Sequence, residues 1–304
     1  MIRRAIVTLA LLCVPWLAGP PPASARQALP QQPLFQANTD VVILDVAVRH
    51  DDDPVMGLTK EDFEVLDNGV AQTLDYVKAE TFPVDLTMVV DQSGSLQPTL
   101  DRVKSAVGAT AELMTPEDTI RVIAFNDKVK EVFDGAPSYA AGAMAKLESE
   151  GATSIYDAIA ASLIRPKSSG RRALVVTFTD GQDTSATISP TVLTEVAKRA
   201  DLVLDIFLAY DEANPLGGRN TSEFDDAFHL LRNVAEATGG MMDDMLGDGH
   251  VTKALKGALL DFRSRYLMAY TVQGVPRSGW HEITVKIKKP GDFKILARKG
   301  YDGK

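Results

Sequence analysis

Oxygen-bearing side chains recur at every second residue in the segment Asp91-Gln92-Ser93-Gly94-Ser95. The segment follows an apolar run, residues 86–90, and precedes a helical pattern that opens near Pro98. It is therefore expected to be a strand-to-helix turn. One carboxylate and two hydroxyls converging on a point suit a divalent cation of the magnesium class. The same residue types also form ordinary polar turns, so this segment alone leaves both interpretations open.

Two later strand-to-loop junctions carry similar side chains. Gly151-Ala152-Thr153-Ser154 precedes a predicted helix, and Thr179-Asp180-Gly181-Gln182-Asp183 follows a predicted strand. Ligands of open α/β sheets bind beyond the carboxyl ends of the strands, where such loops meet. With the first segment, the junctions produce the order Asp-x-Ser-x-Ser, then Thr, then Asp.

This order resembles the von Willebrand factor A-type domain over roughly residues 83–264, whose metal-ion-dependent adhesion site uses the same order on the same elements. The resemblance implies that Ser93 and Ser95 ligate the cation through their hydroxyls, and that Thr153 does so when the site is closed on a ligand. Asp91 and Asp180 would act mainly through bound water. The implied ion is Mg²⁺ or Mn²⁺, with Ca²⁺ less favoured. Ala152 stands where the family often has glycine, which removes no oxygen ligand.

The flanking segments also resemble a bacterial exported family in which such a domain lies between two β segments. The resemblance rests on residues 57–65, Gly-Leu-Thr-Lys-Glu-Asp-Phe-Glu-Val, and on Arg298-Lys299-Gly300-Tyr301. It covers nearly the whole mature chain and implies a secreted or periplasmic protein whose partners are largely undefined.

The ligand set implied by the resemblance predicts a binding role. Two carboxylates and three hydroxyls just neutralise a divalent ion, and magnesium takes six oxygen ligands. One coordination position therefore stays open to an aspartate or glutamate of a protein partner. The chain is expected to be a binding or adhesion module and not an enzyme.

The composition is that of a globular protein, and the N-terminus predicts export. The 304 residues are 45% hydrophobic and 24% charged, and the length suggests about two domains. Residues 1–25 have the basic start, the apolar stretch and the Ala23-Ser24-Ala25 cleavage sequence of a signal peptide. The single cysteine, Cys13, lies within this leader. The net charge of −9, without a clustered basic face, disfavours nucleic acid as a partner. No later segment is long and apolar enough to span a membrane.

The pattern along the chain predicts an α/β domain with a doubly wound, mostly parallel sheet, inserted into a small β domain. Residues 26–36 are expected to be a linker, residues 37–82 and 266–304 the two parts of the β domain, and residues 83–265 the α/β domain. Two separate β appendages are the competing interpretation. The predicted strands are 41–48, 63–66, 70–77, 86–90, 119–125, 129–133, 173–179, 202–209, 266–272, 283–287 and 293–297. The predicted helices are 98–114, 140–148, 154–164, 190–200, 223–237 and 251–263.

Two other functions remain alternatives. A structural or assembly protein would make its contacts through an edge strand of the β domain. A secreted hydrolase would need a nucleophile, but Ser93 lacks a Gly-x-Ser-x-Gly elbow. Three of the four histidines are expected in turns or flanks, and His229 in a helix. Ser154 and Asp157 are expected to form a helix capping box, and Asp183 to be a loop acid.

Overall fold

The computed structural model describes residues 41–51, 53–79, 81–94, 97–166, 168, 170–208, 221–244 and 250–303. The predicted leader, the predicted linker and the candidate ligand Ser95 lie outside these residues. Residues 37–304 form one compact unit. The boundaries proposed after residues 82 and 265 therefore stay a prediction.

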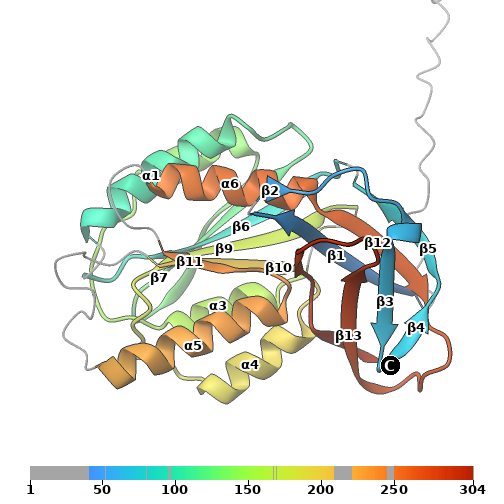
Figure 1. The fold of residues 1–304 in the computed structure, drawn as a ribbon. Helices are drawn as coiled ribbons and strands as arrows, with labels where there is room; N and C mark the ends of the chain where they lie inside the picture. Colours follow the sequence, from blue (N-terminus) through green and yellow to red (C-terminus); the bar gives the residue numbers. More distant parts are fainter. Residues whose placement is uncertain are drawn as a thin grey trace, which may run out of the picture. The chain divides into compact units, whose positions relative to one another are not determined.

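The α/β section alternates strands with helices, as predicted (Figure 1). Its strands are β6 (Val84–Asp91), β7 (Thr119–Phe125), β8 (Val129–Gly135), β9 (Arg172–Thr179), β10 (Val203–Leu208) and β11 (Met242–Asp244). Its helices are α1 (Gln97–Ala111), η3 (Pro137–Tyr139), α2 (Ala140–Met144), α3 (Ile155–Leu163), α4 (Pro190–Arg199), α5 (Thr221–Ala237) and α6 (His250–Ser264).

These strands form one six-stranded sheet in the order β11-β10-β9-β6-β7-β8. All neighbouring pairs are parallel except β7 with the edge strand β8. Helices α1 and α6 lie on one face of the sheet, and α3, α4 and α5 on the other (Figure 1). The carboxyl ends of β6 and β9, which precede two of the predicted loops, are therefore neighbours at one edge.

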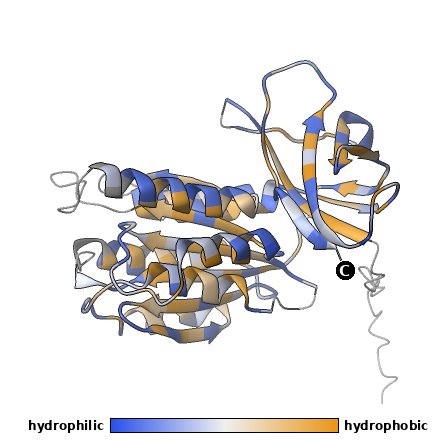
Figure 2. Cartoon of the chain, turned by 90° about the horizontal axis from the view of Figure 1, so that it is seen from below, coloured by the Kyte–Doolittle hydropathy of each residue, from blue (hydrophilic) through white to orange (hydrophobic). Residues whose placement is uncertain are grey.

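The central strand β6 is buried along its whole length. Met88 packs into the hydrophobic cluster beneath α1 and α6, whereas Val89 packs into the cluster beneath α3, α4 and α5. The sequence of such a strand is an uninterrupted apolar run because both faces of the strand are covered. In Figure 2 the strands of this section are mostly hydrophobic, while the helices carry alternating hydrophilic and hydrophobic residues.

The two flanking segments pair with each other in two antiparallel sheets. One sheet has the order β14-β1-β12-β5, with β2 beside β1, and the other has the order β15-β13-β3-β4. In each sheet an N-terminal strand lies beside a C-terminal one, β1 beside β12 and β3 beside β13. The strands are β1 (Val41–His50), β2 (Asp53–Pro54), β3 (Phe63–Asp67), β4 (Val70–Gln72), β5 (Leu74–Lys78), β12 (Tyr266–Thr271), β13 (Gly279–Ile287), β14 (Lys294–Leu296) and β15 (Gly300–Gly303), with a short helix η1 (Lys60–Asp62).

The turn between β3 and β4 is confirmed as the predicted Asn-Gly hairpin turn. Asn68 and Gly69 have φ angles of 48° and 79°, in the left-handed region that this turn requires. The predicted single strand 70–77 is wrong, because the chain passes from one sheet to the other at Thr73. The side chain of Gln72 holds this crossing, since its amide donates to the carbonyl of Gln273 at 2.9 Å and its oxygen accepts the Gln273 N–H at 2.9 Å.

The helix predicted for residues 140–148 ends at Met144. Further along, Ser149 and Glu150 bond to the backbone of Ser93 and Gln92, at 2.5 and 2.7 Å, instead of continuing a helical ladder. The short strands β11 and β15 were not predicted. Strand β15 begins and ends with glycine, a residue of low strand propensity, so its sequence does not predict a strand.

Gly240 is required by the close approach of the turn before β11 to β10. A Cβ atom at this position would overlap the backbone carbonyl of Leu204. We expect Gly240→Ala to lower the free energy of unfolding by about 3 kcal/mol or more, because the backbone itself must move. Gly257→Ala in α6 is the matched control, because no atom lies within 4 Å of its added Cβ. Urea unfolding of both variants measures the difference; equal stabilities would contradict the prediction.

Candidate metal centre

The loop after β6 begins with the buried carboxylate of Asp91, which is 1% exposed. Its Oδ1 accepts the backbone N–H of Ser93 at 2.8 Å. Its Oδ2 accepts the hydroxyl of Thr179, the last residue of β9, at 2.9 Å. The carboxylate therefore ties the first loop to the end of the neighbouring strand.

The environment of Asp91 is unfavourable for a negative charge. Burial raises the pKa of this carboxyl to about 7, and the nearby charge of Asp180 adds to the rise, while bonds from Ser93 and Thr179 oppose it. A carboxylate held in this way is stabilised by any cation placed beside it. The arrangement thus places two acids close enough for the charge of Asp180 to disfavour the ionised form of Asp91.

Asp180 opens the loop after β9 and is 5% exposed. Its Oδ1 accepts the backbone N–H of Gln182 at 2.9 Å, and its Oδ2 accepts the Gln182 side-chain amide at 3.2 Å. Gly181 between them has a φ of 77°, a left-handed conformation that favours glycine. The turn therefore holds the carboxylate next to the end of its own strand.

The loop before α3 contributes Thr153, which is 4% exposed. Its carbonyl accepts the N–H groups of Thr184 and Ser185 at 2.8 and 3.0 Å, and its own N–H donates to the Thr184 hydroxyl at 2.9 Å. These bonds connect the second loop to the loop that Asp180 opens.

The first and second loops are also bonded to each other. Gly94 N–H donates to the carbonyl of Gly151 at 3.4 Å, and the hydroxyl of Ser149 donates to the carbonyl of Ser93. Ser93 itself is 2% exposed. The structure therefore brings Asp91, Ser93, Thr153 and Asp180 into three mutually bonded loops. Ser95 lies outside the described residues.

Hydroxyl groups are essential to any metal site at these loops. Within the described part of the chain, no group of three or more His, Cys, Asp or Glu side chains is arranged to hold a metal ion. Two carboxylates with serine and threonine hydroxyls are a hard-oxygen set of the kind that magnesium accepts. Ligation itself stays a prediction.

Comparison with protein-family models identifies the first part of the α/β section. Residues 86–182 match the model described as von Willebrand factor type A domain. The chain contains a von Willebrand factor type A domain, which we call the A domain. The matched residues include all five candidate ligands.

The solved structures that the chain is similar to are distant from it in sequence. BatB from Bacteroides thetaiotaomicron is 14% identical, with a TM-score of 0.45 over 59% of this chain and 98% of that chain. A von Willebrand factor type A protein from Catenulispora acidiphila is 13% identical, with a TM-score of 0.46 over 87% of this chain and 74% of that chain. The PilB minor pilin from Streptococcus sanguinis is 11% identical, with a TM-score of 0.45 over 60% and 62%. No curated protein sequence matches the chain.

Asp157 in the A domain does not form the predicted capping box with Ser154. Ser154 is the N-cap of α3, but its side chain makes no cap bond. The Asp157 carboxylate instead accepts the backbone N–H groups of Thr187 and Ile188, at 2.9 and 3.0 Å, and the Ser154 hydroxyl bonds that of Ser185 at 2.8 Å. The capping-box prediction is wrong because the loop after β9 offers these side chains stronger tertiary partners.

Two structural roles in the A domain were missed from sequence. Thr179 positions Asp91, and its hydroxyl also accepts the N–H of Gly181 at 3.1 Å. Thr184 holds Thr153 through the two bonds described above. The only signal for Thr179 was its place as the last strand residue before Asp180. Asp183, predicted to be a loop acid, is half-buried, and burial raises its pKa.

The prediction for one histidine is wrong. His281 lies within β13 and is 1% exposed, not in a turn or flank. Its Nδ1 is 2.7 Å from Oδ1 of the buried Asp67, and its ring stacks on Tyr301 at 4.5 Å between centroids. Burial is possible because the carboxylate supplies a polar partner. This cluster belongs to the β section and includes no residue of the three loops.

In the part of the chain that the structure describes, no helix is long and apolar enough to cross a membrane.

Proposed function

We propose that this chain binds a protein ligand through a divalent cation held at the three loops of its A domain. Asp91, Ser93, Ser95, Thr153 and Asp180 would hold Mg²⁺ or Mn²⁺, with Ca²⁺ less favoured. An aspartate or glutamate of the partner would complete the coordination shell. The supporting observation is the buried carboxylate of Asp91, bonded to Ser93 and Thr179 and raised in pKa by burial and by Asp180.

The chemistry of this donor set favours recognition of an acidic group. Two carboxylates balance the charge of the ion without exceeding it, and the hydroxyl ligands are neutral. Magnesium takes six oxygens at about 2.0–2.1 Å, so a partner carboxylate is attracted to the remaining position. A site with more carboxylates would hold the ion more tightly but would repel such a partner. The adhesion or interaction role proposed for the protein follows from this balance.

The surrounding architecture would serve this role outside the cytoplasm. We propose that the leader directs the chain to the periplasm or the exterior, that the doubly wound A domain binds the partner, and that the paired β segments form a separate small domain. Assembly through that β domain is the alternative. A partner captured equally well in chelator and in magnesium would favour it.

We expect magnesium binding to be lost when two candidate ligands are removed. Loss of a single supporting group around a metal commonly weakens affinity about 10- to 100-fold, so Ser93→Ala with Asp180→Ala is expected to weaken it more than about 100-fold. Calorimetric titration of the mature chain with magnesium and manganese measures this. Ser105→Ala with Glu236→Ala, both exposed, is the matched control and should bind like the wild type. No binding by the wild type, or unchanged binding by the ligand variant, would refute the proposed function.

A further inference from the structure

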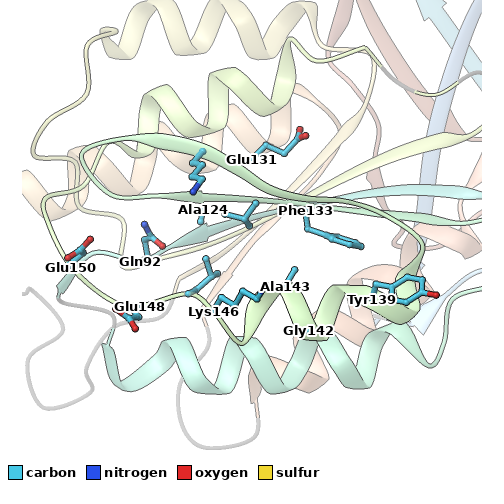
Figure 3. Close-up of a pocket in the computed structure, with 13 residues that line it drawn as sticks. Gln92, Ala124, Glu131, Phe133, Tyr139, Gly142, Ala143, Lys146, Glu148 and Glu150 are labelled. Atoms are coloured by element: carbon cyan, nitrogen blue, oxygen red, sulfur yellow. The ribbon is translucent and has the colours of Figure 1, made fainter.

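A pocket of about 620 Å³ lies beside the candidate metal centre. One wall comes from β7 and β8 and the other from α2 and the segment that follows it, residues 145–150 (Figure 3). We call it the β8–α2 groove. In Figure 3 Gln92 and Glu150 lie toward one end and Tyr139 toward the other. The groove therefore extends from the loops of the centre along the edge of the sheet.

Two of its lining residues belong to the loops of the metal centre. Gln92 stands between Asp91 and Ser93, and Glu150 immediately precedes the Gly151–Thr153 loop. The two are joined by a bond from Glu150 N–H to the Gln92 carbonyl at 2.7 Å. One end of the groove therefore adjoins two of the three loops of the candidate centre.

The interior of the groove can receive an apolar side chain. Phe133 of β8, Ala143 of α2 and Leu147 line it, and Tyr139 lies at its far end with 71% of its surface exposed. Its volume is within the range of roughly 300–1,000 Å³ that suits small ligands, which accommodates a short segment of a few residues. Because β8 is the edge strand of its sheet, a chain can lie alongside it.

The charges at the near end restrict the partner. Glu148 and Glu150 are both exposed there, and the lining as a whole carries these two acids and Glu131 against Lys130 and Lys146. A basic residue of the partner is therefore favoured locally, beside Glu148 and Glu150, since opposite charges attract at short range.

We propose that the β8–α2 groove binds an extended segment of the partner protein, contiguous with the aspartate or glutamate that ligates the cation. The segment places an aromatic or large aliphatic side chain against Phe133 and Ala143, and a lysine or arginine faces Glu148 and Glu150. This inference rests on the proposed function and adds the chemistry of the partner to it.

Gly142 offers a way to fill the groove without disturbing the fold. It lines the groove in the exposed part of α2, and a Cβ atom there would meet nothing within 4 Å. Gly142→Trp therefore places a large ring in the groove. Gly257→Trp is the matched control, since Gly257 is also helical, exposed and free of contacts to an added Cβ.

The probe is a phage-displayed library of random linear peptides, selected on the mature full chain in magnesium and eluted with EDTA. We expect enriched peptides to combine one acidic residue, one aromatic or large aliphatic residue and a lysine or arginine. Gly142→Trp should weaken a selected synthetic peptide about tenfold or more, with magnesium affinity unchanged by calorimetry, and Gly257→Trp should bind it like the wild type. Glu148→Lys with Glu150→Lys should weaken it too, and replacing the peptide's basic residue by glutamate should restore binding to that variant.

The results separate the two proposals. If the wild type binds magnesium but Gly142→Trp leaves peptide affinity unchanged, or if no sequence is enriched, the groove inference is overturned while the metal centre stands. If the wild type binds no magnesium, the proposed function fails.

Discussion

Replacing Asp91 by asparagine is expected to stabilise the metal-free protein above pH 7 and to remove most of its stabilisation by magnesium. The folded-state pKa of Asp91 is raised from 3.8 to about 7, chiefly by burial. The folded state therefore binds this proton more tightly than the unfolded state does. Stability associated with the protonated carboxyl is complete below about pH 4 and is lost as the pH rises to about 7. At 1.36 kcal/mol per pKa unit, the loss is on the order of 4 kcal/mol.

Asparagine avoids this loss and keeps the local bonds. Its side-chain oxygen can accept the Ser93 N–H, as Oδ1 of Asp91 does. Its amide can donate to the Thr179 hydroxyl, which already accepts the N–H of Gly181 but has two acceptor lone pairs. We therefore expect Asp91→Asn to be the more stable chain at pH 8 in EDTA and to have no advantage at pH 4.

Magnesium should remove much of the stability advantage that the asparagine variant has over the wild type at pH 8. A ligand at 100 times its dissociation constant stabilises the protein that binds it by about 2.7 kcal/mol, and the variant lacks the carboxylate that would hold the ion. Thermal unfolding across pH 4–8, with magnesium or EDTA, measures both effects. A variant that is less stable than the wild type in EDTA at pH 8, or equally stabilised by magnesium, would contradict this prediction.

Replacing Arg265 by methionine is expected to cost about 3–5 kcal/mol of the free energy of unfolding. Arg265 follows α6 and is 1% exposed. It donates to the carbonyl of Gly239 at 2.7 Å and to the carboxylate of Asp261 at 3.3 Å. Asp261 also accepts Arg49 of β1 at 3.0 Å. Removing one member of a buried ionic group leaves its partners uncompensated, which accounts for the large cost.

The effect of Arg265 should depend on Asp205 of β10. Burial raises the pKa of Asp205 to about 6, and the charge of Arg265 opposes that rise. Without Arg265 the ionised Asp205 becomes less favourable, so Asp205→Asn should recover part of the loss in a double-mutant cycle. Urea unfolding at pH 7 measures it. Arg199→Met is the control: Arg199 pairs with Asp302 at the surface, where such pairs contribute about 0–1 kcal/mol. Equal costs at the two arginines would contradict the prediction.

The order of helices and strands in the A domain could be predicted because its apolar runs are long and uninterrupted. Residues 174–178 are such a run, and β9 is buried there on both faces. The flanking β strands were harder to predict where tertiary contacts decide the path of the chain. The crossing at Thr73 depends on Gln72 bonding Gln273, which is 201 residues away.

The placement of Asp91, Ser93, Thr153 and Asp180 on loops could also be predicted, because each lies at or just after the end of a strand or just before a helix. Asp91 and Asp180 lie on neighbouring loops because the parallel strands β6 and β9 are paired. The supporting bonds could not be predicted in this way. Thr179 donates to a carboxylate 88 residues earlier, and Asp157 accepts from a loop about 30 residues later; neither partner is marked by local spacing.

The position of a bound ion tests the central claim most directly. Crystals of the mature protein grown or soaked with manganese should show an anomalous difference peak at the three loops. We expect it at coordination distance, about 2.1 Å, from the Ser93 hydroxyl, with Asp91 and Asp180 close by. At saturating manganese, a site without a peak, or an ion bound only elsewhere on the chain, would contradict the account.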